Sequence, residues 1–299
     1  MTLPPPDRPA LRVLASGSAG NCSVLVVPSA TGDDAGGAGP ARVVLIDAGL
    51  SPRKTETLLA DSGIGLEDVS DILLTHLAHD HAHTGWARPA VAPNATLRIH
   101  RAHMGRARRA GLLHRRTEPM DDGPNEIART LTADTARMAH DDLGVCVFRL
   151  RLDQVGCDIG FATDLGRPTE ALIDHLTGVD VLAIESNYCP DMQESSDRPA
   201  FLKRRIMGGA GHLSNEEAAE AVDRIGPREH VVFLHLSRDC NQPERVSALH
   251  EGADYAWTIA SQSTPTRWIP ITPSNARATP MPRLAAIGAR QHALFGPRA

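Results

Sequence analysis

Four histidines and one aspartate end the stretch ILLTHLAHDHAH, which covers residues 72–83. The side chains that can do chemistry here are His76, His79, Asp80, His81 and His83. Imidazole and carboxylate together suit zinc, manganese or iron. The apolar run DILLT before His76 has the length of a buried strand. A metal site just beyond a strand is therefore predicted, in preference to a solvated polar turn.

More histidines and carboxylates end predicted strands in the second half of the chain. They are His140 in MAHDD, Asp164 in FATDLG, Glu185 in IESN and His235 in FLHLS. Open α/β sheets place their sites at the carboxyl ends of strands. Taken alone, His140 and His235 would be structural histidines and Asp164 would begin a turn. Taken together with residues 76–81, they predict a metal site assembled from several loops.

Strand-like and helix-like segments alternate along the chain. The runs LRVLAS, CSVLVV and RVVLIDAG are typical of strands, and residues 52–62 have helical spacing. Later strand-like runs alternate with helical patterns around residues 168–176, 215–225 and 243–250. This alternation predicts a layered α/β architecture. We expect a flexible N-terminus over residues 1–10, one folded domain over 11–273 and a loosely ordered extension over 274–299.

Composition excludes several classes of protein. No stretch approaches the ~18 apolar residues of a membrane span, so no membrane partner is expected. The five cysteines never form C-x-x-C, which indicates neither a disulfide framework nor a thiolate zinc finger. The start of the chain has no signal-peptide pattern, and a cytoplasmic location is expected. The net charge of −5 means that any nucleic-acid binding must be local.

One local basic segment is RIHRAHMGRARRAGLLHRR, centred on Arg106, Arg108 and Arg109. It is either a solvated helix face or a phosphate-binding surface whose affinity would fall with salt. The basic residues at 203–205 could extend that surface. Because aromatic residues make up only 3% of the chain, stacking platforms should be sparse. Contact with the backbone of a duplex or of an end is favoured.

Two further motifs have ordinary structural interpretations. Ser214 and Glu217 in LSNEEAAEAV have the spacing of a capping box. The same helix start, at Ser214 and Asn215, could also receive a phosphate. The turn SGSAGN matches neither a P-loop nor a dinucleotide fingerprint, so it predicts no nucleotide cofactor.

Several motifs in order carry a family resemblance over residues 11–268. They are LASGSAGNCSVL, LIDAGLS, LLTHLAHDH, AHDD, FATDLG, IESNYCPDM, LKRRI…GHLSNEEAA and LHLSRDCNQPE. The chain resembles the metallo-β-lactamase fold hydrolases, whose signature is H-x-H-x-D-H after a strand. Within them it is most similar to the YycJ/WalJ-like group of cytoplasmic nucleases and phosphodiesterases. The resemblance implies a four-layered αββα sandwich.

The resemblance also implies a set of metal ligands. It assigns one ion to His76, His140 and bridging Asp164, and a second ion to Asp80, His81, Asp164 and His235. Ala78 departs from the signature, because a histidine ligand of the first ion usually stands there. That ion would be weakly held, more hydrated or absent until substrate binds, unless His79 or His83 replaces the ligand. Asp47 and Glu185 are candidates for orienting the ligating histidines.

The implied cofactors are one or two divalent ions, zinc or manganese, with iron also compatible. They would generate a metal-bound hydroxide that attacks a phosphodiester. Asp80 would orient it, and His212 would bind the phosphate or protonate the leaving oxygen. The group implies an exonuclease-like activity on DNA. The alternatives are a small, for example cyclic, phosphodiester as substrate, or a metal-binding homologue that has lost catalysis at Ala78.

Overall fold

The structure of the protein is a computed structural model that describes residues 3–4, 7–28, 41–88, 90–114 and 116–273. The extension predicted over residues 274–299 lies outside the described residues. The same holds for residues 29–40 and for parts of the predicted N-terminal segment.

The strands of the described residues form two seven-stranded sheets. In spatial order, the first sheet contains β14 (Ile269–Pro270), β1 (Ala10–Ala15), β2 (Cys22–Val27), β3 (Arg42–Ile46), β4 (Val69–Leu74), β5 (Thr96–His100) and β6 (Thr117–Met120). The second contains β13 (Ala256–Ile259), β12 (His230–Leu234), β11 (Val181–Glu185), β10 (Cys157–Ala162), β9 (Val145–Leu152), β8 (Leu131–Met138) and β7 (Gly123–Ala128).

Short helices connect the strands. The α-helices are α1 (Pro52–Ala60), α2 (Met104–Arg109), α3 (Glu170–Leu176), α4 (Pro190–Ser195), α5 (Ala200–Met207), α6 (Asn215–Ile225) and α7 (Pro243–His250). The 3-10 turns are η1 (Leu66–Asp68), η2 (Thr84–Ala87), η3 (Arg101–His103) and η4 (Leu112–His114). The capping box predicted at the start of α6 is confirmed, since Ser214 and Glu217 cap each other's backbone.

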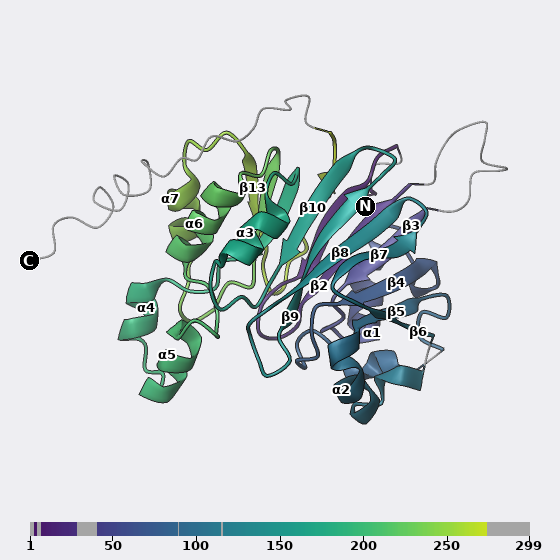
Figure 1. Ribbon diagram of the computed structural model, residues 1–299, viewed down its shortest axis with the longest axis horizontal. Coiled ribbons are helices and arrows are strands. Elements are labelled where there is room, and N and C mark those ends of the chain that lie inside the picture. The colour runs from purple at the N-terminus through teal and green to yellow at the C-terminus, as the bar shows by residue number, and fades with distance from the viewer. Residues whose placement is uncertain (1–2, 5–6, 29–40, 89, 115, 274–299) are drawn as a thin grey trace, which may run out of the picture.

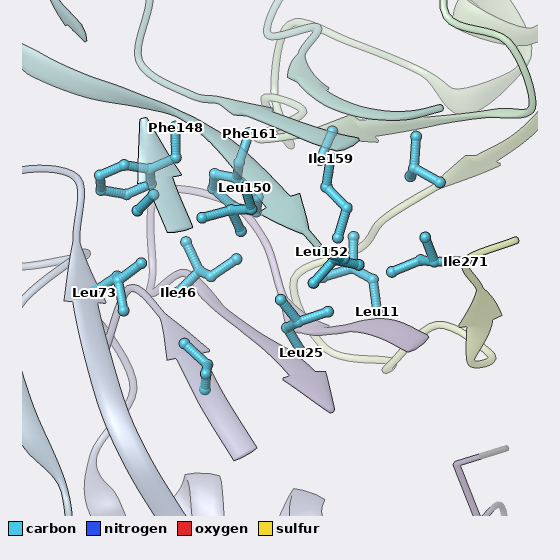
Figure 2. Close-up of a cluster of buried hydrophobic side chains, with 14 of the residues drawn as sticks. Leu11, Leu25, Ile46, Leu73, Phe148, Leu150, Leu152, Ile159, Phe161 and Ile271 are labelled. Atoms are coloured by element: carbon cyan, nitrogen blue, oxygen red, sulfur yellow. The ribbon is translucent and has the colours of Figure 1, made fainter. Parts of the chain in front are cut away.

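Apolar side chains that alternate along the strands hold the two sheets together. Figure 2 shows Leu25, Ile46 and Leu73 of the first sheet facing Phe148 and Phe161 of the second. A second cluster packs α1 and α2 against the first sheet, and a third packs α3, α6 and α7 against the second. Figure 1 shows these helices on the outer faces of the sandwich. The predicted four-layered αββα architecture is therefore confirmed.

Strand directions bring the predicted site residues to one edge. β3 and β4 are parallel neighbours in the first sheet, and β10, β11 and β12 are parallel in the second. β8 is antiparallel to β9, which is antiparallel to β10, so β8 and β10 run the same way. The carboxyl ends of each set share an edge, which is where such sheets build sites. In the part of the chain that is described, no helix is long and apolar enough to cross a membrane.

Candidate metal centre

The predicted ligands come from the ends of four strands. His76 lies two residues beyond β4, His140 two beyond β8, Asp164 two beyond β10, and His235 directly after β12. Together with Asp80, they line one cavity of about 710 Å³. The strand order thus gathers residues that are up to 159 positions apart in the sequence.

Asp164 lies at the centre of these side chains. Its Oδ2 is 2.7 Å from His81 Nε2, and its Oδ1 is 3.2 Å from His235 Nδ1. One possible set of ligand atoms, all within 4.8 Å of one another, comes from His76, His81 and Asp164. Another such set comes from Asp80, His81 and His235. The geometry therefore offers two adjacent positions to a cation that share His81, and Asp164 of the first position contacts His235 of the second.

Hydrogen bonds at Nδ1 orient two of the imidazoles that follow β4. His81 Nδ1 donates to Asp47 Oδ2 at 2.7 Å, and Thr75 Oγ1 lies 3.1 Å from His76 Nδ1. Thr75 in turn donates to Asp47. Residues that hold the outer nitrogen of a ligating histidine fix its ring and direct the other nitrogen to the metal.

The histidines of the second sheet are held in the same way. His140 Nδ1 donates to the Gly211 carbonyl at 3.1 Å, and His235 Nδ1 lies 3.2 Å from Glu185 Oε1. Within the described residues, the Nε2 atoms of His76 and His235 are buried and have no hydrogen-bond partner. An unpaired buried nitrogen is costly in a protein interior. These nitrogens therefore fit a metal ion, which would supply the partner that the protein does not.

The backbone is unusual at three of the strand ends. Asp47, Asp164 and His235 have φ angles of 59°, 54° and 56°. Left-handed conformations of non-glycine residues cost roughly 1–3 kcal/mol each and cluster at functional sites. Asp47 and Asp164 contact the histidine cluster, and His235 belongs to it. The unfavourable backbone conformations therefore occur at the candidate site.

A close backbone contact supports the turn at Asp80. A Cβ on Gly49 would lie 1.7 Å from the Asp80 carbonyl oxygen, so only glycine fits there. Asn21 donates from its backbone to the same carbonyl at 2.7 Å, and its Nδ2 lies 2.9 Å from His81 Nε2. The interpretation of SGSAGN as a simple tight turn missed this contact. The only signal in the sequence was an asparagine ending a glycine-rich turn.

Burial and nearby charges shift the pKa values of His76 and His235 in opposite directions. Burial and the neighbouring His81 lower the pKa of His76 to about 3, so its ring is neutral. Burial also opposes charge on His235, but Asp164, Asp80 and Glu185 together outweigh it and raise its pKa to about 10. Asp164 itself has a pKa well below its usual range, because His235 and His81 outweigh its burial. A divalent cation would displace protons from this cluster, since ligating imidazoles must be neutral.

His212 and Glu185 form a pair beside the cluster. His212 Nδ1 lies 2.6 Å from Glu185 Oε1 and 3.4 Å from Asp164 Oδ1. Burial would raise the pKa of Glu185, but His212 outweighs it and lowers that pKa. The other Glu185 oxygen accepts from the Leu165 backbone at 2.7 Å. His212 lines the cavity, so its Nε2 remains available there.

A family model described as Beta-lactamase superfamily domain matches residues 42–236. The chain belongs to this superfamily. Exodeoxyribonuclease WalJ of Streptococcus pneumoniae serotype 2 is 28% identical over 243 residues, which cover 78% of this chain and 83% of WalJ. Exodeoxyribonuclease YycJ of Bacillus anthracis is 27% identical over 246 residues, with 78% and 84% covered.

A solved structure supports the superfamily assignment at the level of the fold. The metallo-β-lactamase fold protein YhfI of Bacillus subtilis superposes with a TM-score of 0.62 at 17% identity, covering 87% of this chain and 99% of YhfI. The predicted fold and family resemblance are confirmed. The chain is a metallo-β-lactamase hydrolase with a His/Asp cluster that suits divalent metal, distantly related to two exodeoxyribonucleases.

The two candidates to replace the missing superfamily histidine are placed differently, because His79 lines the cavity with Ala78 whereas His83 does not. The His79 side chain is 92% exposed, with its Nδ1 3.8 Å from Asp80 Oδ1. His83 Nδ1 accepts from the Gly85 backbone at 2.9 Å and caps η2, away from the cavity lining. His140 has its ring centroid 5.3 Å from that of His76 and belongs to neither ligand set. The first metal position is therefore the more open one.

Arg106 does not line the cavity, although its partner Asp141 does. It pairs with Asp141 at 2.5 Å and with Asp142 at 3.2 Å. These aspartates directly follow His140, so Arg106 anchors the loop that carries this histidine. Arg108 and Arg109 are exposed on α2 and do not line the cavity.

The predicted substrate contacts of Ser214 and Asn215 also have internal partners. Ser214 Oγ accepts from the Glu217 backbone at 3.1 Å. The Asn215 side chain is buried and donates to Asn241 Oδ1 at 2.9 Å. Neither residue lines the cavity. Because these polar atoms are engaged inside the protein, both residues support the start of α6.

Proposed function

We propose that this chain is a metal-dependent phosphodiesterase that cleaves DNA from an end. The observation that carries the proposal is the convergence of imidazole and carboxylate groups on one cavity, with the outer nitrogens of the imidazoles already held by the protein. The names of the two exodeoxyribonuclease relatives support DNA as the substrate. Mixed nitrogen and oxygen donors favour zinc or manganese, with iron also compatible.

The ligand sets of the proposal follow the superfamily resemblance, which places His140 instead of His81 at the first position and adds Asp164 to the second. His76, His140 and Asp164 would hold one ion, and Asp80, His81, Asp164 and His235 would hold the other. When bound, the ions supply Lewis-acid stabilisation of the phosphate and a more acidic water.

The protein's own groups have separate roles in the proposal. Asp80 Oδ2 lies 3.7 Å from both His81 Nε2 and His235 Nε2, where a carboxylate can orient a water molecule. Glu185 holds His212 by its Nδ1. His212 can therefore carry a proton at Nε2 and give it to the leaving oxygen, as a general acid does.

The test is hydrolysis coupled to metal content. Protein purified without chelator is assayed on 5′-labelled single-stranded and duplex DNA and on bis(p-nitrophenyl) phosphate. Cleavage should stop after chelation and return with zinc or manganese. Turnover of the small ester without DNA cleavage would indicate a small-molecule phosphodiesterase. Bound metal with turnover of neither substrate would contradict the enzymatic proposal.

The alanine at position 78 favours a second candidate function, that of a metal-binding protein without catalytic activity. Ala78 lines the cavity beside the more open position, so Ala78→His should add a donor there. We expect binding of the second equivalent of metal to tighten at least roughly 10- to 100-fold, the size of effect that even outer partners of ligands produce. Titration against a chelating dye measures this affinity.

The control for this substitution is Ala110→His, at an exposed position outside the cavity lining. Equal metal affinity in both variants would show that position 78 does not face a metal. Turnover that is present only in Ala78→His would support the non-catalytic candidate for the natural chain.

A further inference from the structure

The exposed aromatic side chain of Phe201 is unusual in this protein. It is 67% exposed and is one of only two large apolar side chains exposed among the described residues; the other is Leu3. A single exposed apolar residue is ordinary on a protein surface. Its surroundings therefore decide whether Phe201 has a role.

Phe201 lies on the helix that forms one wall of the cavity. The helix is α5, at the lower left of Figure 1 next to α4. Leu202, Arg205 and Ile206 of this helix line the cavity. Phe201 and Arg205 are four positions apart, so their side chains are neighbours on the same helix face. The ring of Phe201 is therefore adjacent to a residue of the cavity wall.

The arginine beside this ring is free to bind an anion. Of the two arginines in the cavity lining, Arg198 pairs with Asp239 at 3.0 Å. Arg205 is exposed, and no hydrogen bond or ion pair of its side chain is found in the part of the chain that is described. Arg204, next to it, is also exposed. This helix presents positive charge next to an aromatic face, although the chain as a whole carries −5.

We propose that Phe201 and Arg205 form a platform for a single-stranded end of nucleic acid that enters the cavity. This inference rests on the proposed nuclease function. Phe201 stacks on an unpaired base, and Arg205 binds a neighbouring phosphate. A paired base within a duplex has its faces covered by the adjacent bases, whereas an unpaired base offers a free face to an aromatic ring. Despite the low aromatic content of the chain, one stacking residue thus lies at the rim of the site.

Phe201→Ala tests the stacking half of the platform in the full-length, metal-loaded protein. The ratio of kcat/KM on a single-stranded oligonucleotide to kcat/KM on bis(p-nitrophenyl) phosphate should fall roughly 5- to 150-fold, the range that loss of one base–aromatic contact gives. The loss should appear mainly in KM. Phe201→Trp should retain the wild-type ratio. A 2-aminopurine at the strand end should be quenched by the wild type and less by Phe201→Ala.

Arg205→Gln tests the phosphate half. The dependence of log Kd on log salt for the single strand should become shallower by about 0.7, the value for one phosphate contact. The matched control for the aromatic substitution is Leu3→Ala, the other exposed apolar residue, which is absent from the cavity lining.

The possible failures are distinguishable. An unchanged substrate ratio and unchanged quenching in Phe201→Ala, with the small ester still hydrolysed, would overturn the platform and leave the proposed function standing. An equal loss of affinity for a blunt duplex would overturn the preference for single strands. Absence of all hydrolysis by the wild type would instead count against the proposed function, and the quenching measurement would still test the platform.

Discussion

Asp164→Asn is expected to strip bound metal from the protein and to lower hydrolysis at least roughly 1,000-fold. Asp164 is within 2.7 Å of His81 Nε2 and within 3.2 Å of His235 Nδ1, so both proposed positions depend on it. An amide has no charge to offer a cation. Metal ions supply several kcal/mol of stabilisation to the transition state, and each ~1.36 kcal/mol is a factor of ten in rate. Plasma mass spectrometry and the two-substrate assay measure the losses.

Asparagine is the informative replacement because it keeps the shape of the side chain. The backbone at position 164 has a φ of 54°, a conformation that asparagine tolerates well. The matched control is Asp180→Asn. Asp180 is also buried and accepts from the Asp158 backbone at 2.8 Å, but it precedes β11, at the opposite end of the strand from Glu185. Full metal content and activity in Asp164→Asn would refute the ligand assignment.

Much of the fold and the gathering of the candidate site could be predicted from local patterns. Several strand-length apolar runs ended in a histidine or a carboxylate, and parallel strands bring such ends to one edge. His76, Asp164 and His235 could be picked out in this way because each lies within two residues of a strand end.

Whether a neighbouring histidine replaces the ligand missing at Ala78 could not be predicted, because this depends on the geometry of a turn. The backbone N–H groups of His81 and Ala82 both donate to the Ala78 carbonyl at 2.9 Å. In such a helical turn, consecutive side chains point in different directions, and the His79 side chain is 92% exposed. The spacing in HLAHDH shows that a histidine ligand is missing at position 78. It does not show how far the side chain of the neighbouring His79 is exposed to solvent.

Contacts between segments that are far apart in the sequence explain the other features that local sequence patterns did not predict. Arg106 looked like part of a phosphate-binding run, yet its partners Asp141 and Asp142 lie 35 and 36 positions further along the chain. A run of like charges cannot reveal which members are neutralised by a loop elsewhere in the sequence. Phe201 had no signal of its own either, because its exposure depends on how α5 packs beside the cavity.

His212→Asn should separate the general acid from the metal ligands. Loss of general acid catalysis costs about 10²- to 10⁴-fold, and we expect that loss on DNA, whose leaving oxygen is a poor anion. On bis(p-nitrophenyl) phosphate we expect only a small loss, since p-nitrophenolate departs without a proton. The expectation follows from the 2.6 Å contact between His212 Nδ1 and Glu185, which leaves Nε2 as the nitrogen that can carry the proton into the cavity.

The comparison of substrates also tests the competing role of this histidine. His212 belongs to a further set of possible ligand atoms with Asp164, Glu185 and His235. If it held a metal ion, His212→Asn would slow both substrates equally and lower the metal content. The control is His230→Gln, a partly buried histidine of β12 that bonds Thr258 at 2.9 Å outside the cavity. A loss confined to DNA, with metal content unchanged, assigns proton transfer to His212 and leaves ion binding to the other histidines.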